Sequence, residues 1–184
     1  MSPLILMPPI STDRWPVYLE GIRNAKMPCS LLETGRMHNA TNAYFYGDGA
    51  STLLFANQAC IERVYSIDID PQSEEICKYI IDRATDRIEF INDNSIDALP
   101  TLKGICFGVI LLDSAEDSEL NASELLLCIE NGLMDENTIL LLDDTGTKSK
   151  RIMDQTEYYV LIAKNDRCAA IRIFDLPGII KQLI

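Results

Sequence analysis

Residues 107–113 read Phe-Gly-Val-Ile-Leu-Leu-Asp, and residues 138–143 read Thr-Ile-Leu-Leu-Leu-Asp. Nearly unbroken apolar runs of this length are typical of strands that are buried on both faces, as in a parallel sheet. Shorter apolar runs with acidic or small residues near their ends lie upstream, at 30–35, 61–70 and 88–91. We therefore predict five strands of a mostly parallel sheet.

The intervals between these runs show the apolar spacing of helices, at 51–59, 73–85 and 123–131. Gly132 is expected to end the third of these helices, and a leading amphipathic helix is expected at 13–25. Residues 158–163 and 168–174 flank a short polar turn and predict an antiparallel hairpin. Strands that alternate with helices and end in a hairpin predict an α/β three-layer sandwich with a seven-stranded sheet.

Composition narrows the functional class. The 184 residues fit a single domain, 1–184, with a leading helix region at 1–29. The net charge of −12 argues against a nucleic-acid partner, and no apolar run approaches the roughly 20 residues of a membrane span. Six cysteines without a Cys-x-x-Cys pair, and a single histidine, argue against a zinc site. Reduced cysteines of this kind are expected in the cytoplasm.

Ligands of open α/β sheets bind beyond the carboxyl ends of the strands, and polar residues gather at those ends in this sequence. Glu33, Thr34 and Gly35 end the first strand. A glycine-containing segment then leads into a helix, whose free N–H groups suit a carboxylate or phosphate: Gly47, Gly49, Ala50, Ser51 and Thr52. Asp68 ends the second strand, where a carboxylate can accept bonds from both ribose hydroxyls. Asp70 is expected to cap the next helix.

These motifs, continued by residues 90–95, 111–113 and 142–144, occur in the order that resembles class I S-adenosylmethionine-dependent methyltransferases. The resemblance covers Leu31 to Phe174 and implies a Rossmann-like fold with S-adenosylmethionine as cofactor. The resemblance implies that the residues from Glu33 to Gly35 and from Gly47 to Thr52 lie around the methionine part of this cofactor. It also places Asp113 at the cofactor. Asp68 would bind the ribose, Ile69 would pack on the adenine, and Asn94 or Ser95 would lie at the adenine amino group.

A finer resemblance is to the cation-dependent O-methyltransferases of the catechol type. In that pattern Asp113, Asp143 and Asp144 would hold a magnesium ion, because hard oxygen ligands suit such cations. The alternative is that Asp143 and Asp144 end their strand and cap the following segment without a metal. Sugar O-methyltransferases with a Glu-Thr-Gly loop have a similar acidic pair, so the pattern leaves the substrate class open.

The sequence departs from these families in two places. Residues 36–46 form an insertion that would lie at the mouth of the site, as a lid or a substrate-reading element. Asp113 and His38 are the candidate catalytic residues, and His38, which lies in the insertion, would act as a general base. The alternative is that this loop histidine only forms a hydrogen bond with the backbone. Glu116 replaces the lysine base of the catechol-type enzymes. The acidic run 113–124 has a solvated loop face as its alternative interpretation.

The function predicted from the sequence is methyl transfer from S-adenosylmethionine to an oxygen of a small-molecule acceptor, with magnesium as an optional aid. Three alternatives stay open. One is a non-catalytic S-adenosylmethionine- or nucleotide-binding protein, and another is a receiver-type switch with clustered acids. The third, an NAD-dependent oxidoreductase, would need a tight Gly-x-Gly-x-x-Gly turn that the spacing of Gly35 and Gly49 does not supply. The acceptor and the oligomeric state are not specified by the sequence.

Overall fold

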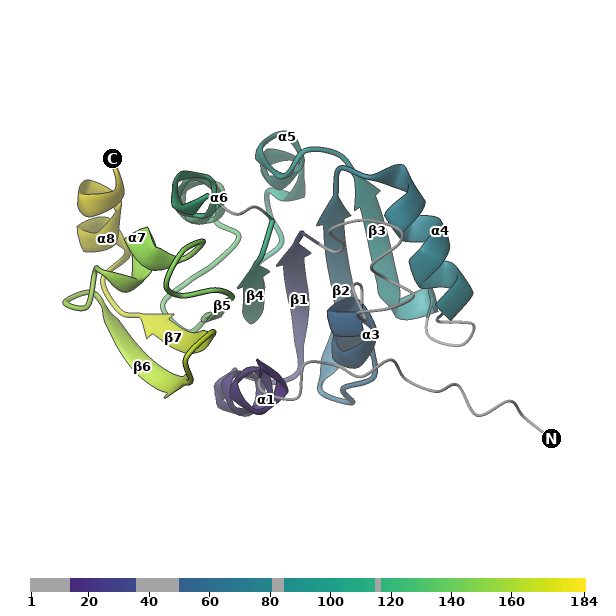
Figure 1. Ribbon diagram of the computed structural model, residues 1–184, viewed down its shortest axis with the longest axis horizontal. Helices are drawn as coiled ribbons and strands as arrows, with labels where there is room; N and C mark the ends of the chain where they lie inside the picture. Colours follow the sequence, from purple (N-terminus) through teal and green to yellow (C-terminus); the bar gives the residue numbers. More distant parts are fainter. Residues whose placement is uncertain (1–13, 36–49, 81–84, 115–116) are drawn as a thin grey trace.

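The computed structural model of the chain describes residues 14–35, 50–80, 85–114 and 117–184. Within these ranges seven strands form one sheet, in the order β3-β2-β1-β4-β5-β7-β6 (Figure 1). Five are parallel, and the last two pair antiparallel as a hairpin against β5. The strands are β1 Cys29–Thr34, β2 Ile61–Asp68, β3 Ile88–Asn92, β4 Val109–Leu112, β5 Ile139–Leu142, β6 Tyr159–Lys164 and β7 Ala169–Ile173. The predicted sheet is confirmed.

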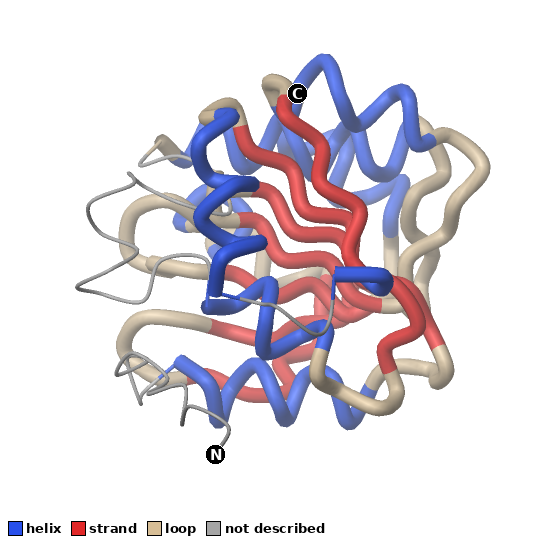
Figure 2. The backbone as a smooth tube through the Cα atoms, turned by 90° about the vertical axis from the view of Figure 1, so that its right-hand side faces the viewer, coloured by secondary structure: helices blue, strands red, loops and turns tan. Residues whose placement is uncertain are grey.

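Helices cover both faces of the sheet, and Figure 2 shows the strands running between them. The described helices are α1 Arg14–Asn24, α3 Ala50–Ala56, α4 Pro71–Ile80, α5 Ser95–Ala98, α6 Ser118–Glu130, α7 Lys150–Met153 and α8 Leu176–Leu183. Two short 3₁₀ turns, η1 Thr85–Arg87 and η2 Leu99–Leu102, complete the described elements. Because no helix among these residues is both long and apolar enough, none of them could cross a membrane.

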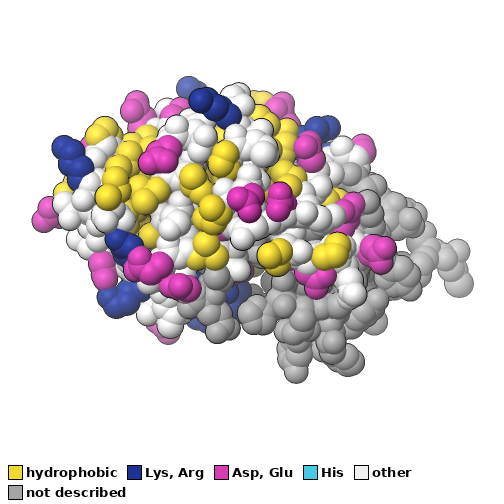
Figure 3. Space-filling model, turned by 90° about the horizontal axis from the view of Figure 1, so that it is seen from above, with side chains coloured by type: hydrophobic (Ala, Val, Ile, Leu, Met, Phe, Trp, Pro, Cys, Tyr) yellow, Lys and Arg dark blue, Asp and Glu magenta, His cyan; other side chains and the backbone are white. Residues whose placement is uncertain are grey.

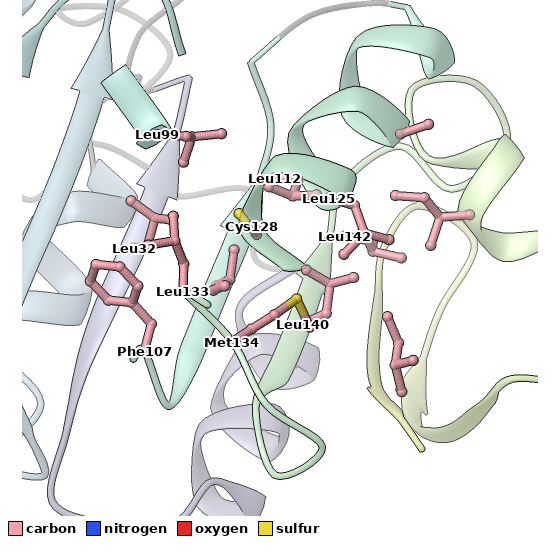
Figure 4. Packing of buried hydrophobic residues seen from close by; sticks show 14 of the residues in the cluster. Leu32, Leu99, Phe107, Leu112, Leu125, Cys128, Leu133, Met134, Leu140 and Leu142 are labelled. Atoms are coloured by element: carbon pink, nitrogen blue, oxygen red, sulfur yellow. The ribbon is translucent and has the colours of Figure 1, made fainter. Parts of the chain in front are cut away.

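The central strands are buried on both faces, as their apolar runs predict. In β4, Val109 and Leu111 join the core that includes α1 and α3, whereas Ile110 and Leu112 join the core that includes α5, α6 and α8. The second core appears in Figure 4, where Leu99 and Leu125 lie against the side chains of these strands. Each layer of helices is therefore held to the sheet by alternate residues of the same strands.

Helix ends differ from the predicted ones where polar side chains reach the backbone. α6 begins at Ser118, five residues before the predicted start, because Asp117 accepts a hydrogen bond from the N–H of Glu119 and caps it. It ends at Glu130, one residue before the predicted end, and Gly132 follows with a φ of +67°. α3 stops at Ala56 instead of continuing to residue 59, and turn bonds of Asn57 and Gln58 follow it.

Candidate functional site

The strand register brings the predicted polar residues to one edge of the sheet. Thr34 pairs with Ile67 of β2 and with Leu112 of β4, and Leu112 pairs with Leu142 of β5. The residues that follow these positions therefore leave the sheet side by side, at the end toward which the parallel strands point in Figure 1. Figure 3 looks onto this end of the molecule and shows acidic side chains spread among apolar ones.

Gly35 is required at the first of these strand ends. Its φ is +77°, and a Cβ atom built on it would lie 2.2 Å from the carbonyl oxygen of Asp113. Its N–H donates to the carbonyl of Ile67, and the N–H of Asp113 donates to the carbonyl of Thr34, both at 3.1 Å. The backbones after β1 and β4 can therefore lie in contact only because residue 35 has no side chain.

Glu33 is hydrogen-bonded to three hydroxyl side chains. Its buried carboxylate accepts hydrogen bonds from Ser51 and Thr52 of α3, and from Ser66 of β2 at 2.9 Å. These bonds tie the first turn of α3 to the carboxyl ends of β1 and β2. Glu33, Ser51 and Thr52 thus lie together, with their polar atoms directed toward one another.

The end of β2 places one buried carboxylate beside one exposed apolar side chain. Asp68 is only 5% exposed, and its Oδ1 accepts from the N–H of Asp70 at 2.8 Å. Ile69 is 73% exposed, which is unusual for a large aliphatic residue and provides a flat apolar contact for a ring. Asp70 accepts from the N–H of Gln72 at 2.9 Å, so the prediction that it caps α4 is confirmed.

The segment after β3 contributes two neighbouring residues with different environments. Asn94 is exposed and caps α5 by accepting from the N–H of Ile96 at 2.9 Å. Ser95 is buried against Glu124 of α6, which also accepts from Thr34 at 3.0 Å. Of the two predicted adenine-amino contacts, only Asn94 therefore has an exposed side chain.

Glu124 is one of the site residues that the sequence reasoning missed. Its carboxyl is fully buried where the segments after β1, β3 and β4 meet. Burial raises its pKa, and the hydroxyls of Ser114, Ser95 and Thr34 oppose that rise. The solvated-loop interpretation of residues 113–124 is wrong at this residue. The available signal was its spacing, because position 124 lies one helical turn before the apolar Cys128.

The three predicted metal-binding aspartates do gather at the ends of β4 and β5, around a lysine. Lys148 lies 2.6 Å from Asp113, 4.0 Å from Asp143 and 3.9 Å from Asp144, measured from its Nζ to the nearest carboxylate oxygens. Burial lowers the pKa of Lys148, but the three carboxylates outweigh it and raise that pKa above its ordinary value. The ammonium is thus held in the charged form.

Two arginines neutralise the remaining carboxylates. Arg14 of α1 lies 2.8 Å from Asp143, and Arg167 of the β6–β7 turn lies 3.1 Å from Asp144. Asp143 is only 1% exposed, and the hydroxyl of Tyr18 also donates to it at 3.4 Å. Burial, followed by the charge of Asp143, raises the pKa of Asp113, while Lys148 opposes the rise.

This arrangement does not fit a divalent cation. An ion among the three carboxylates would lie about 4 Å from the ammonium of Lys148, and its repulsion would be about 8 kcal/mol at an effective dielectric constant of about 20. In the part of the chain that the structure describes, no group of three or more acidic, His or Cys side chains is suited to hold a metal ion. The expected ligands are present, but they are already paired with cations of the chain.

Several predicted residues lie outside the described ranges. These are His38 with the rest of the 36–46 insertion, Gly47, Gly49 and Glu116. Ala50 is described only as the first residue of α3. The proposed lid and general base therefore stay predictions.

Comparison with known proteins supplies the family. A family model described as a methyltransferase domain matches residues 45–145, just over half of the chain. The chain belongs to this methyltransferase family. The matched segment runs from before α3 to after β5 and includes Asp68, Asn94, Asp113 and Asp143. A search of curated proteins found no match.

Solved structures show the same fold at low identity to this methyltransferase. Cofactor-bound Rv0187 from MTB has a TM-score of 0.65 and 19% identity, covering 93% of this chain and 85% of that one. The O-methyltransferase from Bacillus cereus in complex with SAH has a TM-score of 0.60 and 17% identity, with coverage of 93% and 84%. The N-methyltransferase NodS from Bradyrhizobium japonicum, with S-adenosyl-L-homocysteine, has a TM-score of 0.58 and 13% identity, with coverage of 93% and 91%.

Proposed function

We propose that the chain transfers a methyl group from S-adenosylmethionine to an oxygen of a small-molecule acceptor. The observation that carries this proposal is the common edge at which Gly35, Asp68 and Asp113 leave three neighbouring strands. The family match favours methyl transfer over the NAD-dependent oxidoreductase and receiver-type alternatives. The solved structures of similar fold include methyltransferases bound to cofactor or to S-adenosylhomocysteine.

The half of the edge formed by β1, β2 and β3 suits the nucleoside part of the cofactor. Asp68 would accept from the ribose hydroxyls, because both oxygens of a carboxylate are acceptors. Ile69, with its exposed side chain, would pack against the adenine ring, and the exposed amide of Asn94 would meet the ring's polar edge. The backbone after Gly35 would lie at the methionine part, as in the resemblance stated for this motif.

The half formed by β4 and β5 suits an oxygen nucleophile. A hydroxyl can donate to the carboxylate of Asp113 and accept from the ammonium of Lys148, which lie 2.6 Å apart. The ammonium would stabilise negative charge on that oxygen as its proton passes to the carboxylate of Asp113. The oxygen would then form a bond to the methyl group, whose bond to the sulfonium sulfur breaks. An amine acceptor gains nothing comparable from a neighbouring cation, so this pair favours oxygen over nitrogen. Magnesium assistance is left out because the carboxylates are already paired.

Cofactor binding tests the first half of this proposal. We expect S-adenosylhomocysteine to bind the parent protein in isothermal titration, and Asp68→Ala to weaken that binding by at least tenfold. Asp70→Ala is the matched control, because Asp70 is an acid two residues away whose bonds serve the cap of α4. Equal losses in the two variants, or binding of NAD in place of S-adenosylhomocysteine, would contradict the assignment.

Methyl transfer to a panel of acceptors tests the second half. With methyl-labelled S-adenosylmethionine, we expect label to appear on small hydroxyl compounds and not on their amine analogues. Preferential labelling of amines would refute the oxygen assignment. Tight cofactor binding with no transfer to any acceptor would favour the remaining alternative, a non-catalytic binding protein with a methyltransferase fold.

A further inference from the structure

We propose that Lys148 is a built-in cation that takes the place of a divalent metal at the cluster of Asp113, Asp143 and Asp144, so that this cluster neither binds nor needs one. Its ammonium lies within 4.0 Å of all three aspartates that sequence reasoning assigns to magnesium. The inference rests on the proposed function only for the statement that this cluster faces the acceptor. That Lys148 occupies the cluster does not depend on the proposed function.

The loop that carries Lys148 is held in place by its backbone. Asp144 has a φ of +41°, and its carbonyl accepts from the N–H of Thr147 at 2.9 Å, which closes the turn. The buried hydroxyl of Ser149 donates to the carbonyl of Asp143 at 2.9 Å and accepts from Asn121 of α6 at 3.2 Å. Residue 148 is thus anchored on both sides, and its side chain is directed into the acidic cluster.

Each acidic group of this cluster already has a cation of the chain as its partner. Three carboxylates meet three cations, because Arg14 pairs with Asp143 and Arg167 pairs with Asp144 while Lys148 pairs with Asp113. Removal of Lys148 alone would leave Asp113 without the cation that lies 2.6 Å from it. Oxygen ligands left in this state are the kind that Mn²⁺ and Mg²⁺ select.

An ordinary structural salt bridge would behave differently. Its loss would reduce stability, but it would not create an affinity for divalent cations. Lys150 offers the matched comparison, since it pairs with Asp154 at 2.5 Å on the exposed surface two residues further along. A readout of cation binding therefore separates the two possibilities, whereas a melting temperature alone does not.

The experiment measures free Mn²⁺ by electron paramagnetic resonance as each protein is titrated. We expect the parent protein and Lys150→Ala to leave the Mn²⁺ signal unchanged at submillimolar concentrations. Lys148→Ala should bind Mn²⁺ at least tenfold more tightly than the parent, and the added change Asp113→Asn should abolish that gain. Lys148→Gln, which retains length and polarity, serves as the second variant if the alanine form does not fold.

The inference is overturned if the parent protein binds Mn²⁺ at these concentrations, or if a folded Lys148 variant binds it no better than the parent. Activity is tested separately by adding EDTA to chelate divalent cations, and we expect the rate of methyl transfer by the parent protein to be unchanged. Because Mn²⁺ binding is measured without turnover, a failure to find an acceptor would refute the proposed function without affecting this result.

Discussion

Replacement of Gly35 by alanine should lower the free energy of unfolding for two separate reasons. The first is the left-handed backbone, since a φ of +77° costs an L-residue about 1–2 kcal/mol. The second is close approach, because the new Cβ atom would lie 2.2 Å from the carbonyl oxygen of Asp113 and 2.4 Å from the Cα atom of Ser114. Relief of that overlap requires the backbone after β4 to move, which costs roughly a further 1–3 kcal/mol.

Gly132 provides the matched control. Its φ is +67°, but a Cβ atom there would meet nothing within 4 Å, so Gly132→Ala carries the backbone cost alone. Both substitutions gain the same small amount of stability, because alanine restricts the unfolded chain more than glycine does. We therefore expect Gly35→Ala to destabilise the fold by about 2 kcal/mol more than Gly132→Ala. The displacement of Asp113 should also weaken S-adenosylhomocysteine binding in the first variant only.

Urea unfolding followed by the fluorescence of Trp15 is the assay. Trp15 is the single tryptophan, and its ring lies 5.8 Å from that of Phe55 across α1 and α3, so its emission reports on native packing. For an unfolding slope of about 2 kcal/mol per molar urea, the expected difference moves the midpoint by roughly 1 M. Equal midpoints for the two alanine variants would refute the argument that contact between the two strand ends requires a glycine.

Glu124→Gln should remove a pH dependence. The pKa of Glu124 is raised in the folded state, so the free energy of unfolding of the parent, relative to this variant, should fall as pH rises from 4.5 to the raised pKa. The fall is at most about 1.4 kcal/mol per pH unit. Urea unfolding that shows the parent gaining stability over the variant as pH rises would contradict this. Thiol labelling should distinguish Cys106, which is exposed, from Cys128, whose thiol is buried and has a raised pKa. Mass spectrometry of the folded protein should find iodoacetamide on Cys106 and none on Cys128, and labelling of both at similar rates would show that the core opens.

The sheet was predictable because each strand carries its own signal. The apolar runs at 107–113 and 138–143 specify burial on both faces, and this property depends on local sequence alone. The short elements were not predictable in the same way. α5 spans only Ser95–Ala98, which is shorter than the interval over which helical periodicity can be recognised.

The candidate site was predictable as a set of strand ends, but not as a set of charges. The resemblance to the catechol-type enzymes assigned Asp113, Asp143 and Asp144 to one place, and it is at one edge of the sheet that parallel strands end. Their partners come from distant parts of the chain, since Lys148 follows Asp113 by 35 positions and Arg14 precedes Asp143 by more than a hundred. Nothing local marks a lysine in the polar segment 147–150 as the partner of three acids, so the pairing appears only after folding.

The same long-range pairing means that the acidic cluster is completed late in synthesis, because the chain is made from its N-terminus. Arg14 is near the beginning of the chain, whereas Arg167 is in the turn of the final hairpin, and the two meet at Asp143 and Asp144. A nascent chain that has emerged from the ribosome only as far as residue 113, just after β4, already holds Gly35, Asp68 and Asn94, yet Asp113 is the one aspartate of the cluster that it contains. Products truncated between residues 144 and 167 would therefore retain the segments proposed to bind the nucleoside, while Asp144 would lack the arginine that lies 3.1 Å from it in the folded chain.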